Sequence, residues 1–167
     1  MMVVQSSEKG AGTVLPQLDL GYLALFLGLR VNELVMERMA AAGFAQIRES
    51  HGFVIQHLIE SERSITELAE RMEVTQQAAS KVVAELIELG ALEATAGEDR
   101  RAKRIRLSKR GWQVVQLGRR ERRGIDRRLR ASAGEKNYAA ARSILEECLK
   151  ALGGIERIES RRVRHPR

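Results

Sequence analysis

A short polar run carries the side chains best suited to specific chemistry: Thr75, Gln76, Gln77, Ser80 and Lys81. Glutamine can form a pair of hydrogen bonds with adenine, serine can bond to either kind of base edge, and lysine can reach guanine or phosphate. Such side chains at the N-terminal end of a helix are typical of a helix that enters the major groove of DNA. The same run also fits an ordinary solvated helix start, so the neighbouring elements must decide between the two interpretations.

Two closely spaced helices are predicted to position this run. Ser64 and Glu67 have the spacing of a capping box, which opens a short helix that ends near Glu73. Thr75 is a second N-cap, and the longer helix behind it ends at Gly90. A short helix, a turn of about three residues and a longer helix make a helix-turn-helix. The apolar face expected for the longer helix is Ala78, Ala79, Val82, Val83, Leu86 and Ile87.

A basic hairpin is predicted directly after these helices. Residues 91–95 can form a strand, residues 96–102 a polar tip, and residues 103–107 a second strand with Ile105 and Leu107 inward. An arginine at the tip can reach the minor groove, and Asp99 is placed to orient Arg101. The candidate DNA-binding residues of both elements are Ser64, Thr75, Gln76, Gln77, Ser80, Lys81, Asp99, Arg100, Arg101 and Lys103.

The charge distribution supports a polyanionic partner. The chain carries a net charge of +7, yet residues 98–130 alone carry 14 Lys/Arg and 4 Asp/Glu, a net of +10. A dense basic block on an otherwise slightly acidic body favours a surface that meets nucleic acid. The arginines of 119–130 leave two hypotheses open: they touch phosphate, or they are neutralised at a dimer base by Glu33, Glu37, Glu146 and Glu147.

Further helices are predicted on both sides of this lobe. They span residues 18–42, with Gly43 ending the helix, then 49–60 and 109–130. A capping box from Ser132 to Glu135 opens a last helix that runs to about residue 159. The residues expected to pack the 109–130 helix are Trp112, Val115, Ile125 and Leu129.

Two apolar surfaces exceed what one subunit can bury. Residues 20–29 (LGYLALFLGL) are too few to cross ~30 Å of hydrocarbon as a helix, and residues 138–155 hold apolar positions at heptad spacing. We therefore expect a homodimer and no membrane span. The predicted interface residues are Tyr22, Leu25, Leu29, Tyr138, Leu145, Cys148, Leu152 and Ile155.

Several function classes find no support in the sequence. One cysteine excludes an intramolecular disulfide and a thiolate zinc cluster, and it fits a cytoplasmic location. The three histidines lack metal-ligand spacing, and no nucleophile–base set or phosphate-binding glycine loop is visible. We therefore expect no metal site, no cofactor and no enzyme activity.

The segment 64–111 resembles the winged helix-turn-helix of MarR-type transcriptional regulators. The specific part is DRRAKRIRLSKRG at residues 99–111, which looks like the family's wing pattern of Asp-x-Arg followed by Leu, Ser and Gly. One departure is Glu73, where the family often has Gly. The resemblance covers about residues 18–159 and implies a homodimer with two DNA-reading lobes and an inverted-repeat operator. It also implies a cleft for a small aromatic or anionic ligand, for which the candidates are Phe44, His51, Phe53 and Trp112.

The expected fold is mainly α-helical with a small β-wing. A tail (1–17) precedes a single domain (18–159), and a basic tail (160–167) follows it. Within the domain, the winged helix-turn-helix spans about 49–108, and dimerisation helices span about 18–42 and 109–159. The expected function is a sequence-specific double-stranded DNA-binding regulator, most simply a repressor. The alternative is a helical dimer whose winged helix binds protein or RNA.

Overall fold

The computed structural model describes residues 17–96, 103–155 and 158. It confirms a mainly helical fold with a two-stranded wing, and its elements are α1 (Leu20–Met39), α2 (Glu49–His57), α3 (Ile65–Met72), α4 (Gln76–Glu88), β1 (Leu92–Ala96), β2 (Lys103–Leu107), α5 (Lys109–Ala133) and α6 (Glu135–Ala151). A π-type turn (Ala40–Phe44) ends the first helix, and Gly43 takes a φ of 87° there. In the described part of the chain, no helix is long and apolar enough to span a membrane.

The caps of the helix-turn-helix are those predicted from sequence. The hydroxyl of Ser64 accepts from the Glu67 amide at 3.2 Å, and the Glu67 carboxylate accepts from the Ser64 amide at 2.6 Å. Glu73 ends α3 in the left-handed region at φ 54°, alone among the described non-glycine residues. Thr75 caps α4 by accepting from the Ala78 amide. The strained turn therefore forms at Glu73 without a glycine.

The apolar face of α4 is narrower than predicted. Ala79, Val83 and Leu86 are buried, whereas Ala78 and Ile87 are exposed. The reason is that α4 packs on α3, α2 and β1 along one stripe, which leaves both flanks of that stripe in solvent. The exposed positions therefore belong to the outer surface of the lobe.

The wing is an antiparallel pair whose register joins Leu92 to Leu107 and Ala94 to Ile105. Ile105 and Leu107 are buried, as predicted, and the first strand starts one residue later than expected. Arg63 forms an additional antiparallel bridge with Ile105, so the loop before α3 pairs with the outer edge of strand β2. The predicted tip at 97–102 lies outside the described residues.

The long helix α5 differs from the prediction at both ends. Val115 and Ile125 are buried, but Trp112 is 39% exposed and Leu129 is 37% exposed, so neither is a core anchor. The helix also continues to Ala133. The capping box predicted from Ser132 was wrong, because the break falls at Gly134, where φ is 78°, and Glu135 binds Arg130 instead.

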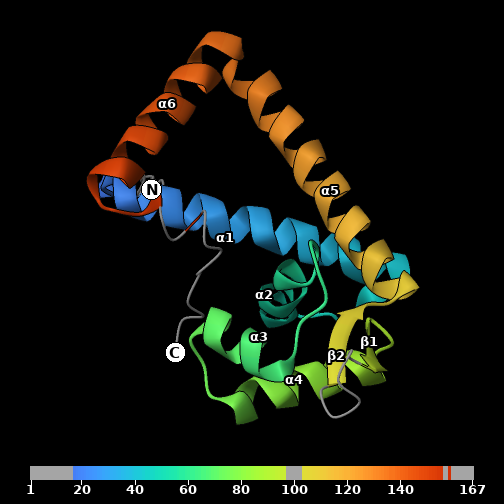
Figure 1. The fold of residues 1–167 in the computed structure, drawn as a ribbon. Helices are drawn as coiled ribbons and strands as arrows, with labels where there is room; N and C mark the ends of the chain where they lie inside the picture. Colours follow the sequence, from blue (N-terminus) through green and yellow to red (C-terminus); the bar gives the residue numbers. More distant parts are fainter. Residues whose placement is uncertain (1–16, 97–102, 156–157, 159–167) are drawn as a thin grey trace, which may run out of the picture.

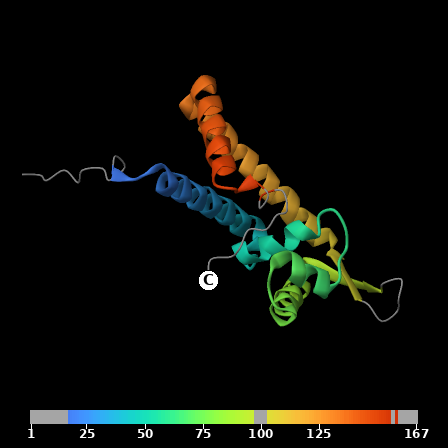
Figure 2. The same cartoon turned by 60° about the vertical axis from the view of Figure 1, so that its left-hand side comes forward.

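The last helix is shorter than predicted, and its heptad seam is interrupted. Helix α6 ends at Ala151, and Gly153 at φ 67° breaks it before Ile155. Leu152 is 84% exposed at the C-cap, and α6 buries no residue. The helices α1, α5 and α6 form an open triangle above the winged lobe (Figure 1). The same arrangement is seen from the side in Figure 2.

Candidate nucleic-acid interface

The N-terminal half of α4 presents its polar side chains outward from the lobe. Gln77, Ser80 and Lys81 are exposed and lie on the side away from the buried stripe. Gln76 is also exposed, but its amide donates to the Thr66 hydroxyl at 2.6 Å. Ser64 and Thr75 use their hydroxyls as helix caps. Three of the six helix-turn-helix candidates are therefore free to read bases, and the other three also hold the local structure.

The described part of the wing carries three cations: Lys103, which is exposed, Arg106, which is exposed and paired with Glu93, and Arg104. Arg104 donates to the Glu67 carboxylate at 2.8 Å and to the Glu62 carbonyl at 3.1 Å. It thereby ties β2 to the start of α3. Sequence reasoning missed this residue because a cation in a basic wing looks like a phosphate ligand. Asp99, Arg100 and Arg101 lie outside the described residues.

The Glu67 carboxylate interacts with Ser64, the N-cap residue of α3, and with Arg104 of the wing. The backbone hydrogen bond from Ser64 holds the pKa of Glu67 below its ordinary value, and the charge of Arg104 acts in the same direction. The carboxylate therefore stays ionised while it binds both the cap and the wing. This fixes the angle between the hairpin and the helix-turn-helix.

A polar cluster ties the reading helix to α2. The Arg48 amide donates to Nδ1 of His51 at 3.2 Å, and Nε2 of the ring lies 3.0 Å from the Arg48 guanidinium and 3.4 Å from the Glu85 carboxylate. The Arg48 guanidinium also binds Glu85. Burial lowers the pKa of His51, which is 1% exposed, and the His51 hydrogen bond lowers the pKa of Glu85. The cluster of Arg48, neutral His51 and Glu85 thus holds α4 against the start of α2.

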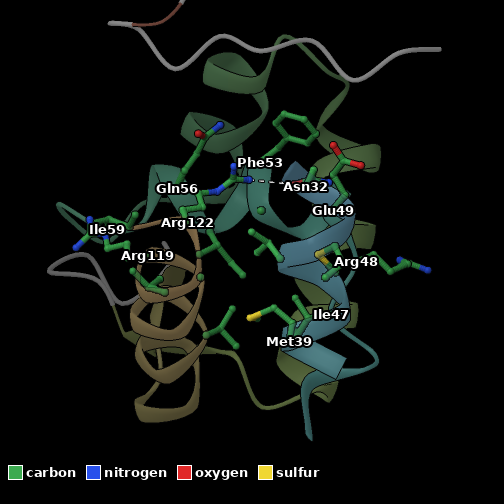
Figure 3. A pocket seen from close by; sticks show the side chains of 17 residues that line it. Asn32, Met39, Ile47, Arg48, Glu49, Phe53, Gln56, Ile59, Arg119 and Arg122 are labelled. Carbon is green, nitrogen blue, oxygen red and sulfur yellow. Dashed lines mark hydrogen bonds between the residues drawn. The ribbon is translucent and has the colours of Figure 1, made fainter. Parts of the chain in front are cut away.

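A cavity of about 410 Å³ lies between α1, α2 and α5 (Figure 3). Apolar side chains form most of it, and Arg122 reaches across one end to donate to Asn32 at 3.0 Å. Arg48 also borders the cavity, but its guanidinium points away from it. The apolar lining includes Val35, Met39, Ile47, Phe53, Ile55 and Val115.

The cavity contains one of the four ligand candidates. Phe53 lines it, whereas Phe44, His51 and Trp112 do not. Phe44 lies under the guanidinium of Arg110 at 4.8 Å, and His51 is buried in the cluster with Glu85. The prediction chose aromatic residues, but the wall is mostly aliphatic and includes α1, whose part in it the sequence pattern did not reveal.

The arginines of α5 are not neutralised by the acids proposed from sequence. Glu33 and Glu37 bind Arg30, Glu146 binds Arg142, and Glu147 accepts from Ser143. The pairings of the block that do occur join Arg120 to Glu121, Arg122 to Asn32 and Arg130 to Glu135. Within one chain those four glutamates contact other residues, and neutralisation of the block at a dimer base stays a hypothesis.

The predicted dimer residues divide into two groups. Tyr22, Leu25 and Leu29 of α1 are each at least 45% exposed, as is expected of a surface awaiting a partner. On α6, Leu145 and Cys148 are half-buried, and the Tyr138 hydroxyl donates to Asp126 of the same chain. Tyr138 also lies under the Arg130 guanidinium at 4.6 Å. Tyr138 therefore helps to dock α6 on α5. Over the described residues, no group of three or more His, Cys, Asp or Glu could hold a metal ion.

Comparison with known proteins finds a family match for part of this chain. A sequence model of the MarR family matches residues 45–102. No curated protein sequence gives a significant match. The fold is similar to that of the YusO protein from Bacillus subtilis, with a TM-score of 0.67 and 23% identity over 86% of this chain and 99% of that chain.

Two other similar structures are those of MepR and FabT. MepR, a transcription regulator of the multidrug efflux pump MepA of Staphylococcus aureus, has a TM-score of 0.67 and 14% identity over 81% of this chain and 99% of that chain. FabT of Streptococcus pneumoniae, solved in complex with DNA, has a TM-score of 0.62 and 20% identity over 82% of this chain and 99% of that chain. The matched segment contains α2, α3, α4 and the first wing strand, and the remaining helices share the fold of these proteins. Residues 45–102 therefore match the MarR family, and the described chain shares the overall fold of these solved structures.

Proposed function

We propose that this protein is a sequence-specific double-stranded DNA-binding regulator that represses transcription by occupying a promoter as a homodimer. The observation that carries the proposal is the exposed, uncommitted polar face of α4, formed by Gln77, Ser80 and Lys81, beside a two-stranded wing. A duplex can take this face into its major groove while the wing lies along the neighbouring groove. The DNA-bound structure of FabT, which has a similar fold, supports the same use of the lobe.

The dimer is supported by the apolar surface that one chain leaves open. Leu20, Leu25, Phe26 and Leu27 of α1 are each about half exposed, and α6 buries no side chain. Contiguous apolar surface of this extent marks an interaction site. A second copy related by a two-fold axis would cover both helices and would place two reading helices on one face of a duplex.

The cavity supports a response to a small ligand with an apolar body and one anionic group. Its size lies at the low end of the range for small-molecule sites, ~300–1,000 Å³. Its wall is mainly aliphatic, and Arg122 supplies a guanidinium that can bind a carboxylate or phosphate in place of Asn32. We place the protein in the cytoplasm, where its proposed DNA partner is found.

Selection of bound duplexes from a random pool tests the proposal. We expect an inverted repeat of roughly 16–20 bp, with half-site centres ~10 bp apart. Gln77→Ala should relax specificity at one symmetric pair of positions, at a cost of about 1–3 kcal/mol. The control is Gln116→Ala, an exposed glutamine of α5 that should leave the consensus unchanged. Arg101→Ala should weaken binding by about 1–3 kcal/mol with the fold intact.

The same experiment separates the proposal from the alternative function. A consensus without symmetry would contradict the dimer geometry, and an unchanged consensus after replacing Gln77, Ser80 and Lys81 together would show that α4 is not the reader. Tighter binding to structured RNA than to duplex DNA at physiological salt would favour an RNA-binding module instead.

A further inference from the structure

We propose that the outer face of α5 holds the phosphate backbone of a second DNA segment, apart from the duplex read by α4. The face is an arginine stripe, defined here as Arg123 and Arg127, which are spaced four residues apart and so lie on one side of the helix. Both side chains are exposed, whereas Arg119, one turn earlier, borders the cavity. Among the described residues, neither Arg123 nor Arg127 has a carboxylate within ion-pairing distance, unlike Arg120 and Arg130.

The charge of the chain is concentrated on this helix and not on the reading lobe. Residues 45–107, which hold the helix-turn-helix and wing, carry nine Lys/Arg and eleven Asp/Glu. Residues 109–133 of α5 carry nine Lys/Arg and two Asp/Glu, a net of +7, which equals the net charge of the whole protein. The excess positive charge that attracts a polyanion is therefore held by α5.

The residue type indicates the kind of polyanion. All seven cations between residues 119 and 130 are arginine. The planar guanidinium fork matches phosphate oxygens, and arginine is the usual choice where phosphate must be held in a fixed geometry. Like charges four residues apart destabilise a helix, so a bound anion relieves a repulsion that the chain itself leaves uncompensated. No base-reading helix end or hairpin accompanies the stripe, which fits backbone contact without sequence preference.

The position of the stripe separates it from the operator duplex. A helix rises 1.5 Å per residue, so the stripe lies about 21 to 27 Å along α5 from its start beside the wing. Figures 1 and 2 show α5 leading away from α4 over this length. Charges at that distance are screened at physiological salt, where the Debye length is about 8 Å. The stripe must therefore touch its partner, and the partner is a segment other than the one under α4.

A capture experiment tests the inference with the full-length protein. Protein is bound to saturation on an immobilised duplex of the selected operator, and capture of a labelled, unrelated 20 bp duplex is measured at several salt concentrations. The test variant carries Arg123→Gln and Arg127→Gln, and the control variant loses the same charge at two exposed sites of α6, with Lys136→Gln and Arg142→Gln. Circular dichroism and thermal unfolding check that both variants fold.

We expect the wild type and the control to capture the second duplex with a steep salt dependence. The stripe variant should lose capture at least tenfold while its operator Kd changes less than twofold. Three results would overturn the inference: equal capture by the stripe variant, a parallel loss of operator affinity, which would place the stripe on the operator duplex itself, or equal retention of polyglutamate of matched charge, which would indicate an acidic protein partner.

Discussion

Gly111 is predicted to be the position in α5 that tolerates no side chain. A Cβ added there would lie 2.1 Å from the carbonyl oxygen of Ala91 and 3.0 Å from Cδ2 of Leu107. Ordinary contacts between heavy atoms begin at about 3.5 Å, so the helix start would have to move by more than ~1 Å. The neighbouring Ser108 amide donates to the same Ala91 oxygen at 3.1 Å, and this bond would be strained or lost.

The expected effect of Gly111→Ala follows from these contacts. Overpacking against backbone costs about 1–3 kcal/mol, and the weakened hydrogen bond adds about 1 kcal/mol. The higher helix propensity of alanine offsets about 1 kcal/mol. We therefore expect the free energy of unfolding to fall by about 2 kcal/mol, which lowers the urea midpoint by roughly 1 M for an m-value of about 2 kcal/mol/M.

Gly118→Ala in the same helix is the matched control. A Cβ at Gly118 meets no atom within 4 Å, so only the propensity gain of up to about 1 kcal/mol remains. Both variants should be unfolded at equal protein concentration, because the stability of a dimer depends on concentration. If Gly111→Ala were as stable as wild type, the close approach of α5 to the start of β1 would be refuted.

The remaining predictions concern the pH response, the wing and the dimer. The pKa of His51 in the folded protein is below its ordinary value of 6.5, so the unfolded chain binds the proton more readily. The free energy of unfolding should therefore fall as the pH drops below 6.5. Urea titrations at roughly pH 5.5 to 6.5 should show this fall in wild type and not in His51→Gln. Arg104→Ala should lower the free energy of unfolding by about 1–2 kcal/mol and weaken DNA binding. The control, Arg106→Ala, removes an exposed ion pair with Glu93 and should lower it by less than about 1 kcal/mol. Equal losses in the two variants would contradict the contact that ties the wing to α3. Leu145→Glu with Leu152→Glu should give unfolded or aggregated protein, and light scattering that finds wild type as a folded monomer at micromolar concentration would contradict the dimer.

The local features of the lobe could be predicted from sequence because short-range chemistry determines them. The caps at Ser64 and Thr75 each need a hydroxyl and an amide three residues later, and both form. The inward positions Ile105 and Leu107 follow from strand alternation. The turn at Glu73 was expected from the helix-turn-helix spacing alone, and it forms at the cost of a left-handed residue.

The failed predictions depend on packing between distant segments. The Ser132 capping box has correct spacing, but a cap acts only where the chain leaves the helix, and it does so at Gly134, while Glu135 pairs with Arg130. Trp112 looked like a core residue by size, yet α5 packs on α1 and β2, and the residues that it buries include Val114, Leu117 and Ile125 but not Trp112. The cavity combines three helices, and no single segment shows it.

The two parts of the proposed function meet in α2. One side of this helix, with Gly52, Phe53 and Gln56, borders the cavity. The cap of the same helix, formed by Arg48 and His51, holds Glu85 of the reading helix. Since α2 is only nine residues long and well packed, a displacement at its cavity side cannot be absorbed within it. The path from a ligand to the reading helix is therefore α2 and the polar cluster at its start. Arg123 and Arg127 of α5 do not line the cavity, so their phosphate contact should not depend on the ligand.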